Sequence, residues 1–292
     1  MTQQLVFEEI ETARKTLSDK GLVFESTASF QTSGQAVSIH TCIGPLQSGK
    51  TVNQDAALAV RFDDSFHIKW ACALADGVST SLLSEVGSRV ATWTALAALV
   101  ASPKWIRSHS RALKAFEAAQ AAISELATKL KQDLDELRYK PSYLPAPAYR
   151  HVVNRQTCFQ TTLCLVYSDG KSIHIATVGD SGALLYSDAK GCKELFFPDL
   201  SVSRVNAICP TIISIKLDQC LTIPASNSQL AVFTDGVAKG LAERLGNQVP
   251  VESDFRQVFS KERAEDYLIE LAASTSEEAA DNMTLLIVRQ DW

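Results

Sequence analysis

Short apolar runs fill the first and last parts of the chain, and their length and composition are typical of β-strands. The predicted strands cover residues 37–43, 56–62, 66–75, 161–167, 172–178, 183–186, 211–217, 229–234 and 283–289. Residues 22–37 are polar and give no clear prediction. The strands therefore form two groups, one on each side of the middle of the chain.

A helical repeat separates the two groups of strands. Apolar side chains recur every three or four residues through 82–101 and again through the longer span 103–139, which Pro141 ends. Shorter repeats predict helices over residues 5–18 and 262–273. We interpret the charged outer face of the 103–139 segment as scaffold surface. Strands followed by helices, strands, a helix and a last strand predict sheets covered by helices.

The same pattern indicates the domain organisation. The chain has 292 residues, of which 46% are hydrophobic and 21% charged, so it can bury a full core. No linker separates its polar motifs. We predict one domain over residues 38–292, with residues 1–37 as an N-terminal extension, a short helix and a polar segment, packed on it.

Charge and cysteine content exclude several classes of function. A net charge of −5 and a pI near 5.6 argue against nucleic-acid binding, which usually needs a basic face. No apolar run is long enough to span a membrane, and residues 1–20 do not resemble a signal peptide. The seven cysteines form no C-x-x-C motif, which indicates buried free thiols in a reducing cytoplasm.

Five short aspartate-bearing signatures follow one another along the chain, each beside an apolar run. They are Asn53-Gln54-Asp55, Ala75-Asp76-Gly77, Gly179-Asp180-Ser181-Gly182, Thr234-Asp235-Gly236 and Asp281-Asn282. Mg²⁺ and Mn²⁺ prefer oxygen ligands, and a pair of such ions needs carboxylates from the ends of several strands. The pattern therefore indicates a two-metal hydrolytic site that acts on phosphate.

The residues beside these aspartates fit metal binding. A strand-end carboxylate such as Asp76 can bridge two cations, and Gly77 lets its own carbonyl approach one of them. Asp235-Gly236 repeats this arrangement, and Asn282 can brace Asp281 by hydrogen bonding. A single Asp-Gly pair is more often a turn, so the prediction depends on the ordered set.

The ordered set resembles the PPM family, the metal-dependent serine/threonine protein phosphatases of type 2C. The family pattern runs N-E/Q-D, D-G, T-T-A/L, G-D-S-R, S-D-G and D-N. This chain reads N-Q-D, D-G, Thr161-Thr162-Leu163, G-D-S-G, T-D-G and D-N, over nearly its whole length. The D-G-V-S-T-S form of the second motif resembles a bacterial branch of the family.

The resemblance implies an α+β fold, a four-layer α/β/β/α sandwich with two central antiparallel sheets. It also implies two Mn²⁺ or Mg²⁺ ions per site. Asp76, Asp235 and Asp281 would hold one ion. Asp76, the carbonyl of Gly77 and Asp55, directly or through water, would hold the other.

Further expectations follow from the same resemblance. Asp180 corresponds to the residue that takes a third, weaker ion in bacterial members. The implied activity is hydrolysis of phosphoserine and phosphothreonine by a metal-activated water. The implied substrate is a phosphorylated protein, and a cognate Ser/Thr kinase is a candidate partner, whereas nucleic acid and membrane are not expected.

Three positions depart from the family pattern. Lys50 stands where the family has an arginine that grips the substrate phosphate, so we expect a phosphate contact through a point charge without a bidentate fork. Val78 stands where some members have a histidine general acid, so water would protonate the leaving group. Gly182 replaces the arginine of G-D-S-R, and residues 181–234 lack the usual flap signature.

Two alternative functions stay open at this point. Gly44 to Thr51 read G-P-L-Q-S-G-K-T and match the P-loop pattern of nucleotide-binding proteins. The strand-like residues after this segment leave no room for the helix that a P-loop must open into. The second alternative is a phosphatase-like module that binds phosphorylated partners without turnover. The intact carboxylate set argues against it, and the changes at Lys50 and Gly182 keep it open.

Overall fold

The computed structural model describes residues 23–25, 28–32, 34–42, 52–62, 67–138, 158–187, 191–200, 206–211, 214–226, 229–245, 256, 258–259, 263–276 and 281–290. The helix predicted over residues 5–18 lies outside the described residues. So do the P-loop-like segment from Gly44 to Thr51 and, within it, Lys50.

The described strands form two six-stranded antiparallel sheets. The first contains, in spatial order, β1 (Val23–Glu25), β4 (Ala56–Arg61), β5 (Trp70–Ala75), β6 (Leu163–Ser168), β7 (Ser172–Val178) and β10 (Gln219–Pro224). The second contains β2 (Ala28–Thr32), β3 (Gln35–Cys42), β12 (Met283–Gln290), β11 (Gln229–Phe233), β8 (Gly182–Ser187) and β9 (Gly191–Phe196). The helices are α2 (Ser84–Ala101), α3 (Ser108–Arg138), α5 (Asp235–Arg244) and α7 (Ala264–Ser274).

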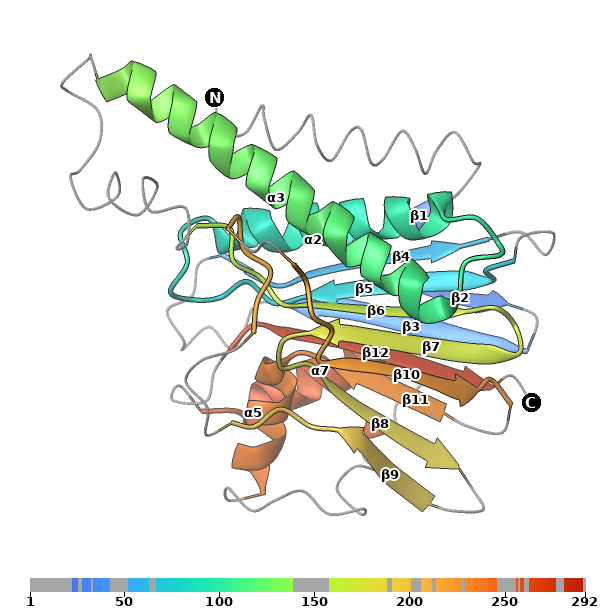
Figure 1. Ribbon diagram of the computed structural model, residues 1–292. Coiled ribbons are helices and arrows are strands. Elements are labelled where there is room, and N and C mark those ends of the chain that lie inside the picture. Colours follow the sequence, from blue (N-terminus) through green and yellow to red (C-terminus); the bar gives the residue numbers. More distant parts are fainter. Residues whose placement is uncertain are drawn as a thin grey trace.

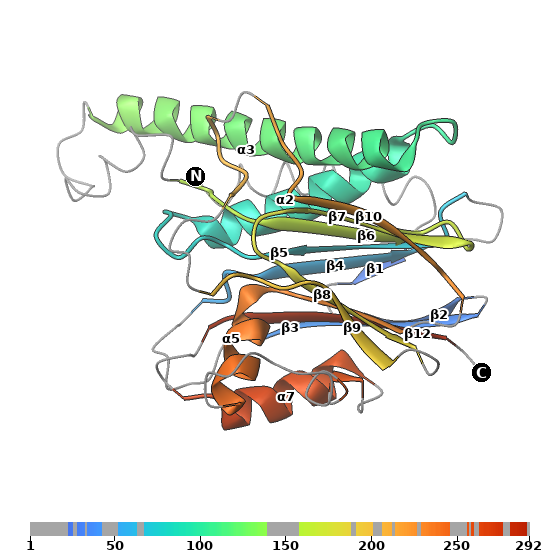
Figure 2. The same ribbon diagram turned by 60° about the horizontal axis from the view of Figure 1, so that its bottom comes forward.

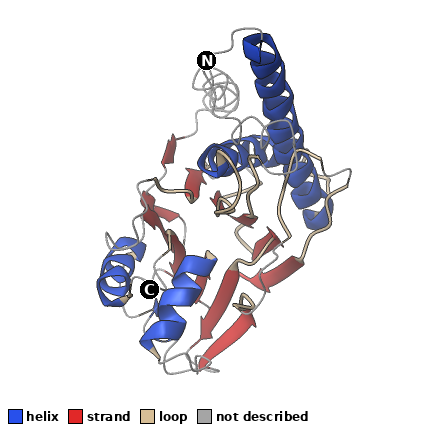
Figure 3. Cartoon of the chain, turned by 90° about the vertical axis from the view of Figure 1, so that its left-hand side faces the viewer, coloured by secondary structure: helices blue, strands red, loops and turns tan. Residues whose placement is uncertain are grey.

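The sheets and helices stack in four layers (Figure 1). Helices α2 and α3 cover the outer face of the first sheet, and α5 and α7 cover the outer face of the second (Figure 2). The side view in Figure 3 shows the strands between the two groups of helices. This arrangement confirms the predicted α+β sandwich.

Strand β5 shows why the central strands read as continuous apolar runs. Its side chains alternate between two cores, because successive residues of a strand point to opposite faces. Trp70, Cys72 and Leu74 belong to the core between the sheets. Ala71, Ala73 and Ala75 belong to the core under α2 and α3, where their small size lets the helix pack closely. Both faces of β5 are therefore buried in hydrophobic core.

The sheet topology brings the polar motifs to one end of the sandwich. Strands β4, β5, β6 and β7 are successive antiparallel neighbours. The start of β4, the end of β5, the start of β6 and the end of β7 therefore lie at the same end of the sheet. In the second sheet, the end of β11 lies beside the start of β12 in the same way. Each aspartate signature occupies one of these strand ends, which explains how distant segments can form one site.

Some elements differ from the predictions. Strands β1, β2, β9 and β10 lie in segments that were not predicted as strands, and helix α5 begins with an Asp-Gly pair, a dipeptide that is usually a turn. The strand predicted over residues 211–217 is wrong, since the described part of that segment forms no strand and β10 begins only at Gln219. Its apolar Ile215 and Leu217 pack against the core under α2 and α3 without joining a sheet.

The cysteines match the prediction in part. All seven are free, and Cys72, Cys158 and Cys164 are buried. Cys220 is exposed, so burial does not account for every thiol. Among the helices that the structure describes, none has both the length and the apolar character needed to cross a membrane.

Candidate functional site

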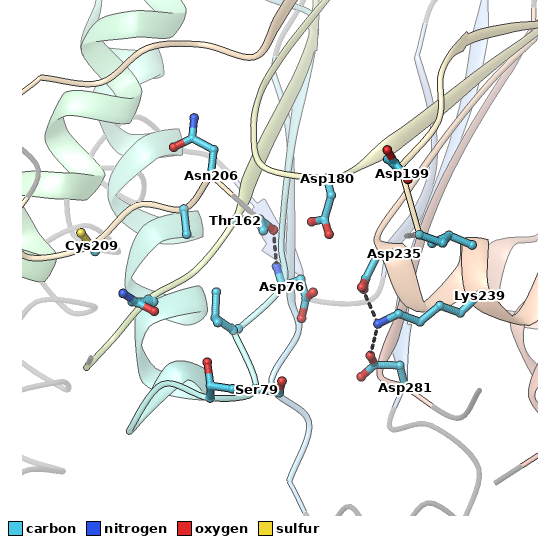
Figure 4. Close-up of a pocket in the computed structure, with 16 residues that line it drawn as sticks. Asp76, Ser79, Thr162, Asp180, Asp199, Asn206, Cys209, Asp235, Lys239 and Asp281 are labelled. Atoms are coloured by element: carbon cyan, nitrogen blue, oxygen red, sulfur yellow. Dashed lines mark hydrogen bonds and ion pairs between the residues drawn. The ribbon is translucent and has the colours of Figure 1, made fainter. Parts of the chain in front are cut away.

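Asp76 lies in the middle of the candidate site, directly after β5. Its backbone N–H donates to Oγ1 of Thr162 over 3.0 Å. Its carbonyl oxygen accepts hydrogen bonds from the N–H of Thr162 over 2.8 Å and from the hydroxyl of Thr161 over 2.9 Å. The Thr-Thr motif therefore fixes the main chain of Asp76, whose carboxylate faces the site (Figure 4).

Asp55 precedes β4 and is only 3% exposed. Its Oδ2 accepts hydrogen bonds from the hydroxyls of Thr234 over 2.9 Å and Thr284 over 2.8 Å. The N–H of Thr284 also donates to Oγ1 of Thr234 over 3.0 Å, which ties the end of β11 to the start of β12. Asp55 is thus the point at which the two sheets are joined beside the site.

Asp235 is the first residue of α5, where the positive end of the helix dipole favours a carboxylate. Lys239, one turn later, places its Nζ 2.5 Å from Oδ2 of Asp235 and 2.6 Å from Oδ2 of Asp281 (Figure 4). Burial acts to lower the pKa of Lys239, but the two carboxylates more than offset this, so the pKa is raised. Sequence reasoning missed Lys239, although the i, i+4 spacing from Asp235 would have indicated the pair had α5 been predicted.

Asp281 lies just before β12. Its Oδ1 accepts the backbone N–H of Asn282 over 2.9 Å. The predicted bracing of Asp281 by Asn282 therefore uses the main chain. The side-chain amide of Asn282 is buried and has no hydrogen-bond partner among the described residues.

The glycines after Asp76 and Asp235 are needed for close packing. A β-carbon at Gly77 would lie 2.8 Å from the carbonyl oxygen of Gln54 and would also crowd the start of α2. A β-carbon at Gly236 would overlap the carbonyl oxygen of Asn282. Each Asp-Gly pair therefore fits tightly against a neighbouring motif, Gly77 against N-Q-D and Gly236 against D-N.

Asp180 follows β7 on a loop held by residues that sequence reasoning missed. Gly179 adopts a φ of 109°, and its N–H donates to Oδ2 of Asp218 over 2.7 Å. The side chain of Asn206 donates to the same carboxylate over 3.1 Å. Asp218 and Asn206 carry no motif and are distant in sequence, so only the folded chain reveals their role.

The predicted ligands meet at a pocket of about 470 Å³. Asp76, Asp180, Asp235 and Asp281 line it, whereas Asp55 is buried behind the lining. The other lining residues are mostly small or polar, among them Gly77, Thr162, Asp199 and Asn206. Lys239 is the one basic side chain in the described part of the lining. The pocket is therefore strongly acidic.

The crowding of these carboxyls changes how tightly they hold protons. Burial raises the pKa of Asp55 to about 7, although hydrogen bonds to it act in the opposite direction. Burial, with the charges of Asp55, Asp235 and Asp281, raises the pKa of Asp76 well above its usual range. Burial and then Asp235 raise the pKa of Asp180 to about 6. Such a cluster needs positive charge to be fully ionised, and bound cations supply it.

The donor set fits divalent cations. Oδ1 of Asp235 is buried without a hydrogen-bond partner among the described residues. Carboxylate and main-chain carbonyl oxygens are the ligands that Mg²⁺ and Mn²⁺ prefer. In the described residues no three acidic, histidine or cysteine side chains converge on one point, and Asp235 and Asp281 both contact Lys239.

The departures from the family pattern can be placed in part. Val78 lines the pocket, where it offers no proton. A β-carbon at Gly182 would overlap the ring of Phe233, so an arginine there would require that ring to move. The predicted phosphate contact of Lys50 lies outside the described residues.

Comparison with known proteins identifies the family and the fold. A family model described as "Protein phosphatase 2C" matches residues 46–279. PppA of Pseudomonas aeruginosa, described as a key regulatory component of T6SS, is a similar solved structure. It has 16% sequence identity and a TM-score of 0.55, and the match covers 90% of this chain and 100% of that chain.

Two other similar structures are of a serine/threonine phosphatase. PstP/Ppp of Mycobacterium tuberculosis has 15% identity and a TM-score of 0.56, with 89% of this chain and 100% of that chain covered. The catalytic domain of PstP in complex with two manganese ions has 16% identity and a TM-score of 0.54, with 88% and 98% covered. At these identities the solved structures show the shared fold. No curated protein sequence matches this chain.

Proposed function

The chain belongs to the protein phosphatase 2C family of metal-dependent serine/threonine phosphatases, and we propose that Asp76, Asp235 and Asp281 carry this activity in it. The observation that most strongly supports the proposal is the convergence of the aspartate motifs on one acidic pocket. The residues lie beside strand ends at the same end of both sheets. The family assignment also disfavours the P-loop alternative for Gly44 to Thr51.

We assign the donors as follows. Asp76, Asp235 and Asp281 would hold one divalent cation, and Asp76, the carbonyl of Gly77 and Asp55 the other. The position of Asp76 in the middle of the site supports a bridging role. The two manganese ions in the similar PstP structure support two Mn²⁺ or Mg²⁺ ions here. Asp180, on the pocket wall, is the donor we propose for a third ion.

The chemistry requires little from the protein beyond positioning. Two bound cations lower the pKa of a water molecule and neutralise charge on phosphoryl oxygens. The hydrogen bonds from Thr161 and Thr162 orient Asp76, and those from Thr234 and Thr284 orient Asp55. No nucleophilic side chain is needed, since water attacks phosphorus in line.

Substrate handling is a further part of the proposal. A phosphoserine or phosphothreonine side chain fits an open polar pocket of this size, and Lys50 would contact its phosphate as a point charge. Val78 leaves the protonation of the leaving group to water. We propose one phosphatase domain over residues 38–292. We also propose a cytoplasmic signalling role in which the protein removes phosphate groups that a Ser/Thr kinase adds. The free cysteines support a reducing compartment.

The test is phosphate release from a phosphothreonine peptide and from an aryl phosphate, with Mn²⁺, with Mg²⁺ and with a chelator. We expect release only with a metal ion, and we expect Asp76→Asn to remain folded and to lose at least about nine-tenths of the turnover. Release that persists in chelator, or turnover of ATP alone, would contradict the proposed function.

A further inference from the structure

The ammonium group of Lys239 lies where the proposed function places part of a metal site. Its Nζ is 2.5 Å from Asp235 and 2.6 Å from Asp281, two of the three proposed ligands of one ion. These contacts join α5 to the loop before β12 (Figure 4). Lys239 therefore does more than pair with its neighbour on the same helix.

Helix geometry keeps Lys239 at this place. Residues four apart on an α-helix lie on the same face, so Lys239 stands one turn above Asp235. The Lys239 side chain is 36% exposed, whereas Asp235 and Asp281 are 11% and 20% exposed. The carboxylates are thus the buried partners, and the lysine reaches them from the pocket side.

A divalent cation and an ammonium group cannot share these two oxygens. Like charges a few ångströms apart repel strongly in a partly buried site. A lysine ammonium has only donors and no lone pair for a metal, so it cannot join the coordination. An ion that binds to these Oδ2 atoms must therefore first displace Lys239.

We propose that Lys239 is a tethered competitor of the ion that Asp76, Asp235 and Asp281 hold, so that this metal site fills only when Lys239 moves away. The inference rests on the proposed function and adds its regulation by metal concentration. Lys239 stabilises the metal-free site by supplying one positive charge to an acidic cluster. It lowers the apparent metal affinity, which equals the intrinsic affinity multiplied by the fraction of molecules in which the carboxylates are not covered by Lys239. If Lys239 covers them in about nine-tenths of the molecules, the apparent Kd of this ion is raised about tenfold.

The test uses the full chain and replaces Lys239 by methionine, which keeps most of the length and removes the charge. Lys239→Gln is a second variant that keeps a polar tip, and it replaces Lys239→Met if that variant is not folded by circular dichroism. The matched control is Lys129→Met on α3. Lys129 pairs with Glu125 over 3.0 Å at the same i, i+4 spacing and with similar exposure, but away from the pocket.

Mn²⁺ binding to the metal-free proteins is measured by titration calorimetry, and Tm is measured in chelator and in Mn²⁺. We expect a Lys239 variant to bind one Mn²⁺ about tenfold more tightly, to have a lower Tm in chelator, and to gain more Tm from Mn²⁺ than wild type. The Lys129 control should match wild type in Mn²⁺ affinity.

The results separate the inference from the proposed function. Equal or weaker Mn²⁺ binding by the Lys239 variants, with wild type binding Mn²⁺, overturns the inference alone. Absence of Mn²⁺ binding and of phosphate release in wild type and variants overturns the proposed function, and the inference with it. Mn²⁺ binding that is detected only in the variants supports both.

Discussion

Replacing Asp55 by asparagine should stabilise the metal-free protein and weaken its response to metal. Asp55 is buried, and its Oδ2 accepts the hydroxyl hydrogen bonds of Thr234 and Thr284. Asparagine keeps one oxygen for both hydroxyls. It also removes a negative charge from beside Asp76 and Asp235, and its N–H₂ group can donate to the carboxylate of Asp76.

The sign and size of this change in stability follow from the pKa of Asp55, which burial raises from 3.8 to about 7. A carboxyl whose folded pKa is raised binds its proton more tightly in the folded state. Its presence therefore costs stability as the pH rises from about 4 to about 7. Each pKa unit corresponds to about 1.4 kcal/mol, so ionised Asp55 costs about 4 kcal/mol at pH 8 and less than about 2 kcal/mol at pH 5.

Asp55→Asn should therefore raise the free energy of unfolding in chelator by about 2–4 kcal/mol at pH 8, and by less than half of that at pH 5. The assay is urea denaturation at both pH values, in chelator and in Mn²⁺. Mn²⁺ should stabilise wild type more than the variant, because the variant lacks a carboxylate donor. An Asp55→Asn variant that is less stable than wild type at pH 8 in chelator would contradict the raised pKa of Asp55.

Asp169→Asn is the control with the opposite sign. Burial alone would raise the pKa of Asp169, but hydrogen bonds from the N–H groups of Ser172 and Lys171 more than offset this, so the pKa is lowered. A lowered folded pKa contributes stability that is present above the unfolded pKa and is lost as pH falls. Asp169→Asn should therefore destabilise the protein at pH 8, with or without Mn²⁺.

Three further variants test separate parts of the site. Asp180→Ala should raise the Mn²⁺ concentration needed for half-maximal hydrolysis while calorimetry still detects the two tighter ions; an unchanged Mn²⁺ dependence would count against a third ion. Gly236→Ala should lower the free energy of unfolding by about 1–3 kcal/mol in urea denaturation, because its β-carbon overlaps the carbonyl of Asn282; wild-type stability would contradict this packing. Lys50→Ala should raise KM for a phosphopeptide several-fold with little change in kcat, since the metal ions still activate water; an unchanged KM would exclude a phosphate contact.

The positions of the aspartates could be predicted because they depend on local signals. An apolar run that stops at a carboxylate marks the end of a buried strand, and Asp76 after β5 shows this directly. Antiparallel pairing then brings alternate strand ends together, as it does for Asp55 before β4 and Asp180 after β7. The chemistry of the site follows from residue types that were visible in the sequence.

The missed features depend on contacts between distant segments or on misleading local rules. Asp235-Gly236 has the composition of a turn, so α5 and the position of Lys239 on it were not predicted. Asp218 holds the loop of Asp180 from a distant segment, and no motif marks it. Every second residue of strand β10 is exposed and only Ile223 is buried, so its sequence forms no continuous apolar run, unlike the neighbouring segment 211–217.

Anomalous diffraction from crystals of the full chain soaked in Mn²⁺ would show directly whether the proposed ligands hold two ions. We expect two Mn²⁺ peaks about 3.5–4 Å apart with the carboxylate of Asp76 between them. One peak should also contact Asp235 and Asp281, with the Nζ of Lys239 displaced from both. Well-diffracting crystals that show no Mn²⁺ at Asp76, or a single ion that Asp76 does not contact, would contradict the two-metal account.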